Sequence, residues 1–140
     1  MRITRIFNAV GQGAFYTETF LGDDGSRFVV VYDCGTETAK KDLTKSLDDQ
    51  IDLFAASYSV IDILFISHFH ADHISGLKRL LSKCKVKKTV IPMLDWPTIT
   101  VTRVQNYLRF DRGLAVESDE IIQSLYFGDG KDERFGEINV

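Results

Sequence analysis

The sequence has few cysteines and no long apolar run, and each shortage excludes a class of protein. Two cysteines among 140 residues, Cys34 and Cys84, give no disulfide framework, so we expect a reducing, cytoplasmic compartment. The longest apolar runs, 28–32 and 63–66, are far shorter than the ~20 residues of a membrane span. Polar residues interrupt the segment 1–5, so we expect neither a signal peptide nor a membrane segment.

A strong net charge is also missing. The 17 Lys and Arg residues nearly balance the 20 Asp and Glu residues, and 44% of the residues are hydrophobic. Intrinsic disorder combines low hydrophobicity with high net charge, so it is excluded. A chain with a net charge of −3 is not expected to coat nucleic acid non-specifically. A chain of this length can bury roughly two-thirds of its unfolded surface, which predicts one core and one domain.

The first third of the chain has the pattern of a β-meander. Apolar residues recur over 1–10, and the segment 15–21 is rich in aromatic and β-branched residues, which fit a pleated surface. Glycines, aspartates and a serine over 22–26 predict a turn. The run 28–32 is then almost continuously apolar, which is typical of a strand covered on both faces.

A helical period follows, and after it a strand–helix–strand succession. The apolar positions at helical spacing are Leu43, Leu47, Ile51 and Phe54. Either Thr36 or Thr38 can cap the start of this helix. We then expect a buried strand over 61–66, a short amphipathic helix from His73 to Cys84, and a strand over 86–91. This succession predicts an α/β layer.

The last third of the chain has a less regular pattern. The segment 98–109 is compatible with a helix or a strand, because Thr, Ile and Val dominate its first half. The segment 118–126 predicts a helix with Ser118 as its cap, and Gly128-Asp129-Gly130 predicts a turn. A further strand begins at 136–140.

All three histidines of the sequence lie within the six residues His68-Phe69-His70-Ala71-Asp72-His73. An apolar strand delivers them to the start of a helix, at the edge where ligands bind in open α/β sheets. Neutral imidazoles and a carboxylate are donors that suit zinc, manganese or iron. The alternative is a polar loop whose histidines cap a helix, which would explain one histidine better than three. We therefore predict a metal site.

The spacing of these residues indicates how they could share two metal ions. His68 and His70 are two residues apart, so in extended backbone they project to the same side. Asp72 and His73 lie where the chain turns into the helix and can point at a second metal. Two such ions, roughly 4 Å apart, can hold a phosphate or acyl oxygen, and a bound metal lowers the pKa of water to about 7. The pattern predicts a hydrolase that uses a metal-bound hydroxide, with Asp72 as its candidate catalytic residue.

The segment from Ser67 to Leu77 resembles the signature of the metallo-β-lactamase fold, H-x-H-x-D-H followed by a small residue, Gly and Leu. The segment 29–35, which ends in Asp33-Cys34-Gly35, is similar to an earlier strand of that family. Val10-Gly11-Gln12-Gly13 resembles the entry of the branch related to DNA-uptake competence proteins. The resemblance extends from residue 3 to Pro92, and more faintly to Val140.

This resemblance implies a role for each residue of the motif. His68 and His70 would bind the first zinc ion, and Asp72 and His73 the second. Asp33 would orient a ligand imidazole and fix its tautomer; its alternative role is to form a turn at the strand end. Histidine at position 70, where the family's di-iron oxygen reductases carry glutamate, favours a hydrolase.

The family pattern also needs ligands that this sequence does not provide. A third histidine for the first metal, a bridging aspartate and a late histidine all come from downstream, whereas no histidine follows His73 here. Asp129 resembles the bridging aspartate only superficially, because the strand at 138–140 should precede that motif. We therefore expect residues 1–140 to be a single, incomplete domain: the N-terminal half of an αββα sandwich, with a mixed sheet and helices on its outer face. Further sequence or a separate partner chain would supply the rest, and a homo-oligomer is a separate expectation.

Two functions agree with these observations. The first is a zinc-dependent hydrolase, with manganese or iron as alternative metals, that cleaves phosphodiester bonds of nucleic acid or a nucleotide. The second is a non-catalytic or partner-completed module that serves assembly or recognition. Six cations within 78–88 could attract a polyanion; they are Lys78, Arg79, Lys83, Lys85, Lys87 and Lys88. Lysines also complement a helix C-terminus and protect sheet edges, which is the interpretation we favour.

Overall fold

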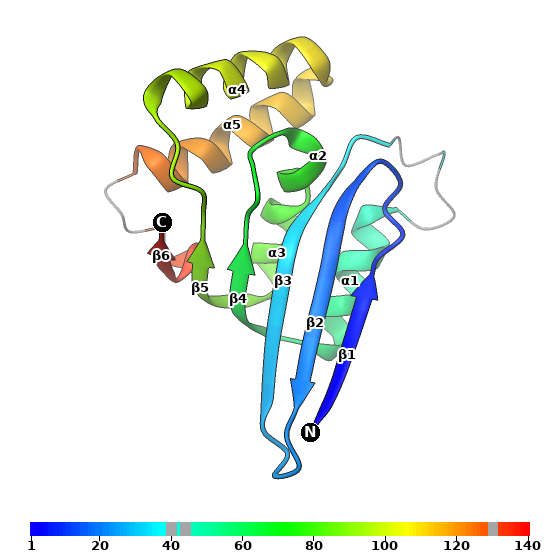
Figure 1. Ribbon diagram of the computed structural model, residues 1–140. Coiled ribbons are helices and arrows are strands. Elements are labelled where there is room, and N and C mark those ends of the chain that lie inside the picture. Colours follow the sequence, from blue (N-terminus) through cyan, green and yellow to red (C-terminus); the bar gives the residue numbers. More distant parts are fainter. Residues whose placement is uncertain (39–41, 43–45, 129–131) are drawn as a thin grey trace.

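The computed structural model describes residues 1–38, 42, 46–128 and 132–140, which form one six-stranded mixed sheet with helices (Figure 1). The strands are β1 Arg2–Phe7, β2 Gly13–Leu21, β3 Arg27–Thr36, β4 Val60–Phe65, β5 Lys85–Val90 and β6 Glu137–Asn139. Their order in the sheet is their order in the chain. β1 to β3 are antiparallel, and β3 to β6 are parallel. The predicted meander, α/β layer and last strand are all present.

In the described residues, five α-helices connect and cover these strands. They are α1 Leu47–Ser57, α2 Ala71–Ile74, α3 Leu77–Lys83, α4 Trp96–Arg109 and α5 Arg112–Tyr126, and a short 3-10 helix spans Glu133–Phe135. Figure 1 shows α1 and α3 behind the sheet and the α4–α5 hairpin beyond the carboxyl ends of β4 and β5. No helix in the described part of the chain is long and apolar enough to cross a membrane.

The core lies between one face of the sheet and the helices α1 and α3. Its helical side chains are Leu47, Ile51 and Phe54 of α1 and Leu77, Leu80 and Leu81 of α3, and its strand side chains include Val29, Val31, Leu64 and Val86. The helical residues recur at the spacing of one helix face, as predicted for α1. Burial of each such side chain contributes about 1.5–3 kcal/mol, so this layer fixes where the strand ends lie.

The opposite face of the sheet carries no helix in the residues that the structure describes. Aromatic residues form a row across it, in which Phe7 pairs with Tyr16, Tyr16 with Tyr32, and Tyr32 with Phe65. In β3, the side chains of Phe28 and Tyr32 are 43% and 44% exposed. The prediction that this strand is covered on both faces is therefore wrong for the described chain, because helices cover only one side of the sheet. We call this face the open face.

Two predicted features of the helices near the motif are wrong. The cap of α1 is Ser46, whose hydroxyl accepts a hydrogen bond from the Asp49 backbone, whereas Thr36 ends β3 and Thr38 precedes the helix. Residue 43 lies outside the described residues. The helix expected from His73 to Cys84 is split into α2 and α3, because the Gly76 N–H donates to the Cys34 carbonyl and draws the chain onto β3.

The α4–α5 hairpin decides between helix and strand for the segment 98–109 and corrects the predicted cap of the helix that follows. The segment 98–109 belongs to helix α4, which Asp95 caps by accepting from the Thr98 backbone. Asp111 caps α5 in the same way, so the prediction of Ser118 as the cap is wrong; Ser118 is fully buried within the helix. The turn predicted at 128–130 lies, apart from its first glycine, outside the described residues.

Candidate metal centre

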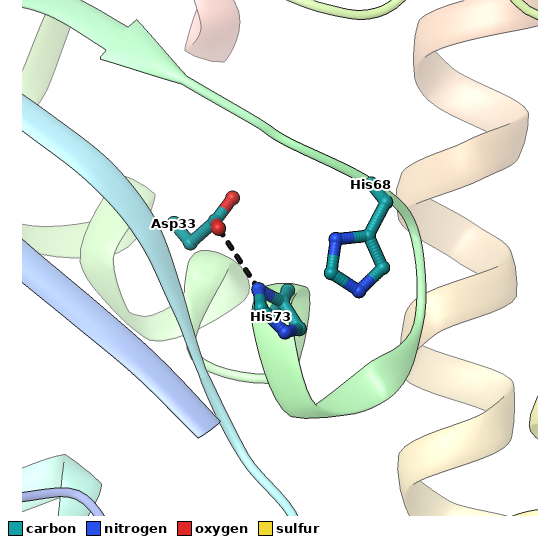
Figure 2. A group of neighbouring side chains, drawn as sticks. All are labelled: Asp33, His68 and His73. Atoms are coloured by element: carbon teal, nitrogen blue, oxygen red, sulfur yellow. Dashed lines mark hydrogen bonds and ion pairs between the residues drawn. The ribbon is translucent and has the colours of Figure 1, made fainter.

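The histidine motif lies where β4 leaves the sheet. Residues 66–70 form a loop after the strand, and His70 is the N-cap of the one-turn helix α2. The end of β3 lies beside this loop, since β3 and β4 are parallel neighbours. Figure 2 shows the side chains of Asp33, His68 and His73 converging from β3, the loop and α2. The topology therefore brings Asp33 to a motif more than thirty residues away.

A β-bulge in β3 aims Asp33 at the motif. Ala14 pairs with Gly35 and Tyr16 with Tyr32, so β3 contains one residue more than β2 between these pairs. Asp33 has a φ of 56°, in the left-handed region that aspartate adopts more readily than most residues. Bulges of this kind redirect a side chain. Here the redirected carboxylate is only 2% exposed and faces the histidines.

The Asp33 carboxylate organises the motif through three hydrogen bonds. Its Oδ1 accepts from the backbone N–H of Ser67 at 2.7 Å, and its Oδ2 accepts from the Ser67 hydroxyl at 2.5 Å. Oδ2 also lies 2.8 Å from Nδ1 of His73. Because both oxygens are engaged within the protein, this geometry favours an orienting role for Asp33 over that of a metal ligand.

These contacts determine which nitrogen of two histidines is free. A carboxylate only accepts, so His73 donates its Nδ1–H to Asp33, and in the neutral imidazole its Nε2 keeps the lone pair. Ser67 gives its single proton to Asp33, and its oxygen therefore accepts from Nδ1–H of His68 at 2.9 Å. The two rings lie 3.7 Å apart between centroids. Ligand atoms of Asp33, His68 and His73 all lie within 4.8 Å of one another.

Burial and charge shift the pKa values of these two histidines in opposite directions. Partial burial, together with the neighbouring His73 and His70, lowers the pKa of His68. Partial burial also acts to lower the pKa of His73, but the hydrogen bond from Asp33 and the charges of Asp33 and Asp72 outweigh it and raise that pKa. Neutral imidazole is the form that binds a metal ion. The lowered pKa of His68 favours this neutral form, whereas the raised pKa of His73 makes a proton a stronger competitor with a metal ion there.

His70 and Asp72 lie beside this group of side chains, outside the set whose ligand atoms are all within 4.8 Å of one another. The ring of His70 lies 5.3 Å from that of His68 between centroids, and its Nε2 lies 2.9 Å from Oε1 of Gln105 on α4. Oδ2 of Asp72 lies 3.4 Å from Nε2 of His73. Oδ1 of Asp72 is buried and has no hydrogen-bond partner among the residues described. An unpaired buried carboxylate oxygen is costly, so this atom fits a cation.

The donor set as a whole fits a divalent metal ion. Three imidazoles, each with one nitrogen engaged and the other free, and a carboxylate oxygen are ligands that zinc, manganese or iron accept. The structure thus gathers the four residues predicted as ligands, His68, His70, Asp72 and His73, with Asp33 behind them. Which of their atoms bind a metal ion stays a prediction.

Two glycines allow the sheet to approach the motif closely. A Cβ on Gly35 would lie 2.6 Å from the backbone carbonyl carbon of His73, and a Cβ on Gly13 would lie 2.7 Å from the carbonyl oxygen of Asp72. Neither position has room for a side chain. Helix α2 therefore rests on the backbone of β2 and β3, which keeps His73 within hydrogen-bond distance of Asp33.

The basic segment 78–88 is largely neutralised by carboxylates. Ion pairs of 2.6–3.7 Å join Lys78 to Glu120, Arg79 and Lys83 to Asp52, Lys87 to Asp62, and Lys88 to Glu137. These pairs support the structural interpretation of the cluster over attraction of a polyanion.

Sequence reasoning missed three residues that contact the motif: Ser67, Gln105 and Asn106. Ser67 directly precedes His68 at a strand end, and this position was an available signal. Gln105 and Asn106 lie on α4, at least 35 residues beyond their partners. No local pattern marks them.

Comparison with known proteins agrees with this geometry. A search of curated proteins found no match to the chain. The model of the metallo-beta-lactamase superfamily matches residues 19–136, which include β3, the histidine motif and the α4–α5 hairpin. The match does not reach Val10-Gly11-Gln12-Gly13, so the competence-related branch stays a prediction. The chain belongs to the metallo-beta-lactamase superfamily.

Proposed function

We propose that this protein is a zinc-dependent hydrolase whose centre is built on His68, His70, Asp72 and His73. The observation that carries the proposal is that hydrogen bonds to Ser67, Asp33 and Gln105 leave one nitrogen free on each imidazole. The buried, unpartnered oxygen of Asp72 adds a negative donor beside them. The superfamily consists mostly of hydrolytic enzymes, which agrees with this use of the site.

The residues of the chain have separate tasks in this proposal. The three histidines hold zinc, and manganese or iron fit the same donors. Asp33 and Ser67 keep His68 and His73 in the metal-binding tautomer. Asp72 lies 3.4 Å from Nε2 of His73 and is the carboxylate placed to hold a proton near the reacting atoms. A zinc ion bound there supplies a Lewis acid and activates water at neutral pH.

We propose a phosphodiester of nucleic acid or a nucleotide as the substrate. A pocket of about 620 Å³ adjoins the site, and Asp33 and His73 belong to its lining. Phe7, Tyr16 and Tyr32 form an aromatic part of its wall. Aromatic side chains stack with bases of any sequence, so this wall suits a nucleobase next to a scissile phosphate.

We further propose that another layer, from further sequence or from a partner chain, packs on the open face and completes the site. Phe7, Phe28 and Tyr32 of the open face are each more than 40% exposed. Exposed apolar surfaces of this kind mark interaction sites. Such a layer would lie beside the histidines and could supply the third histidine, the bridging aspartate and the late histidine of a two-ion site.

Metal content and substrate preference test the proposed function. We expect bound zinc in the purified protein and its loss in His70→Ala, while Gln123→Ala, an exposed position on α5, keeps native metal content. Cleavage of bis-p-nitrophenyl phosphate should exceed that of a β-lactam or a thioester. The reverse order of substrates would overturn the phosphodiester proposal. Absence of metal after zinc reconstitution at neutral pH would overturn the hydrolase proposal and favour a non-catalytic module.

A further inference from the structure

We propose that helix α4 positions His70 for metal binding: Gln105 selects the tautomer of the ring, and Asn106 fixes the backbone on both sides of it. The inference rests on the metal centre proposed above and adds two positioning residues that lie outside the histidine motif. The superfamily match spans both residues but assigns neither a role.

Gln105 contacts the ring of His70 directly. Its Oε1 lies 2.9 Å from Nε2 of His70, in a pocket that Leu108 and Arg109 also line. An amide oxygen only accepts hydrogen bonds, so Nε2 of His70 carries the proton and Nδ1 keeps the lone pair. His68 and His73 are fixed the other way, with Nε2 free. Gln105 therefore leaves Nδ1 of His70 free to bind a metal ion.

Asn106, the next residue of α4, clamps the backbone around His70. Its Nδ2 donates to the Phe69 carbonyl at 2.9 Å, and its Oδ1 accepts from the Ala71 N–H at 3.2 Å. Asn106 is 1% exposed, and the two residues that it bonds are equally buried. One side chain thus satisfies the backbone groups immediately before and after His70, and this restricts rotation of the residue between them.

Contacts of the α4–α5 hairpin hold Gln105 and Asn106 in place beside the histidine loop. Arg103 of α4 forms hydrogen bonds of 2.5 and 3.1 Å to the carboxylate of Asp119 on α5. Tyr126 of α5 packs its ring 5.2 Å from that of Phe69 in the histidine loop. These contacts restrict the orientation of the His70 ring. Substitution of residues that orient a metal ligand lowers metal affinity by about 10–100-fold.

Three substitutions at Gln105 test the tautomer directly. Gln105→Glu keeps an acceptor opposite Nε2, Gln105→Leu removes it, and Gln105→Lys replaces it with a donor. Nitrogen-15 NMR of the metal-free full chain shows which nitrogen of His70 is protonated. We expect protonated Nε2 in the native and Gln105→Glu chains, and protonated Nδ1 in Gln105→Lys. Leu108→Lys places a charge in the same pocket without facing Nε2, and it should keep the native tautomer.

Titration with zinc or cobalt(II) alone gives the second measurement. We expect affinity to fall about 10–100-fold in Gln105→Leu and further in Gln105→Lys, with native affinity in Gln105→Glu. Because Gln105 is exposed, the melting temperatures of the apo variants should match that of the native apo protein. If Gln105 had a purely structural role, metal affinity and the melting temperature of the apo protein would fall together.

Each outcome decides between the two proposals. Protonated Nε2 in Gln105→Lys, or native metal affinity in both Gln105→Leu and Gln105→Lys, would overturn the role of Gln105. If the native chain binds neither metal ion, the metal centre itself is wrong and α4 has no metal ligand to position. The NMR result would then still show whether Gln105 determines the protonated nitrogen.

Two substitutions test Asn106 separately. Asn106→Asp keeps the acceptor for the Ala71 N–H and loses the donor to Phe69, whereas Asn106→Leu loses both bonds. We expect faster amide exchange at Ala71 and weaker cobalt(II) binding in Asn106→Leu, and near-native exchange in Asn106→Asp with intermediate binding. If Asn106→Leu does not fold, Asn106→Asp remains decisive, because cobalt(II) affinity equal to the native value would overturn the clamp.

Discussion

At the scale of single residues, Asp33 combines an uncommon backbone conformation with the central hydrogen bonds of the site. A non-glycine residue at positive φ costs on the order of 1–3 kcal/mol, and Asp33 holds this conformation at φ 56° in a buried position. Its three hydrogen bonds to Ser67 and His73 offset this cost. The strained residue also sets the tautomer of His73 and, through Ser67, that of His68, so conformation and chemistry are coupled here.

Gly35 is the neighbour that this arrangement requires, and Gly35→Ala should disrupt it. The added Cβ would lie 2.6 Å from the backbone of His73, so α2 must move away from β3. We expect a loss of about 1–3 kcal/mol in unfolding free energy, as for other overpacked sites. Zinc affinity should also fall, because His73 moves away from Asp33. Urea unfolding and zinc titration measure the two effects.

Gly113→Ala is the matched control for this change. A Cβ there would meet the end of the Asp111 side chain at 3.2 Å, which a shift of a few tenths of an ångström relieves without touching the motif, and alanine favours the helix in which Gly113 lies. We expect native zinc affinity and little change in stability. Native stability and affinity in Gly35→Ala would show that α2 does not depend on this close approach.

Residue by residue, the sequence predicted those parts of the site that are contiguous in the chain. The motif from His68 to His73 is visible in six positions, and Asp33 was found through a resemblance. Gln105 was not found, because its partner His70 is 35 residues away and its own surroundings are ordinary helix. Contacts that tertiary packing creates leave no trace in local spacing.

At the scale of elements, the α4–α5 hairpin shows the limits of periodicity. The first half of α4 is rich in Thr, Ile and Val, which also suit a strand, yet the segment is helical. The caps Asp95 and Asp111 fix where each helix begins. The four-residue helix α2 is too short to show a period at all. Each helix start thus depends on a single capping residue, and other polar residues nearby are equally good candidates for the cap when the sequence alone is considered.

Tyr126 joins the end of the hairpin to the loop that follows β5, because its hydroxyl donates to the Pro92 carbonyl at 2.6 Å. Burial raises the pKa of Tyr126 to about 12 from 10.0. In the unfolded chain the phenol loses its proton first, so the stabilisation by Tyr126 is present below about pH 10 and is lost as the pH rises through about 12. We expect Tyr126→Phe to lower the unfolding free energy by about 1 kcal/mol at neutral pH. Above pH 10, the unfolding free energy of this variant should fall less steeply with pH than that of the native chain. Urea unfolding across this pH range measures both.

Tyr107→Phe provides the control for the same chemical change. Tyr107 lies on α4 with half of its surface exposed, so its pH profile should run parallel to the native one. A Tyr126→Phe profile parallel to the native profile would contradict the assigned role of Tyr126 in alkaline stability.

At the scale of the molecule, the sequence predicts a sheet covered on both faces, whereas in the described structure helices cover one face. The apolar run of β3 predicted burial on both faces, but only alternate residues, Val29 and Val31, are buried. A continuous apolar run indicates that both faces avoid water; it does not indicate which element covers the second face. The face covered by helices was predictable because α1 and α3, which cover it, lie between the strands in the sequence and show their own apolar period.

The open face should therefore drive association when residues 1–140 are studied alone. Phe28 is 43% exposed and packs edge-on against Phe20 at 6.2 Å, within an apolar face of the kind that marks interaction surfaces. We expect concentration-dependent self-association in sedimentation velocity, and Phe28→Glu should shift the chain towards the monomer, because burying the new carboxylate is costly. Leu53→Glu is the control: Leu53 is 60% exposed on α1, on the side of the sheet that helices cover, and its substitution should leave association unchanged. A monomeric native chain with a sharp, reversible unfolding transition would contradict the proposal, because such a chain would be stable with the open face in water.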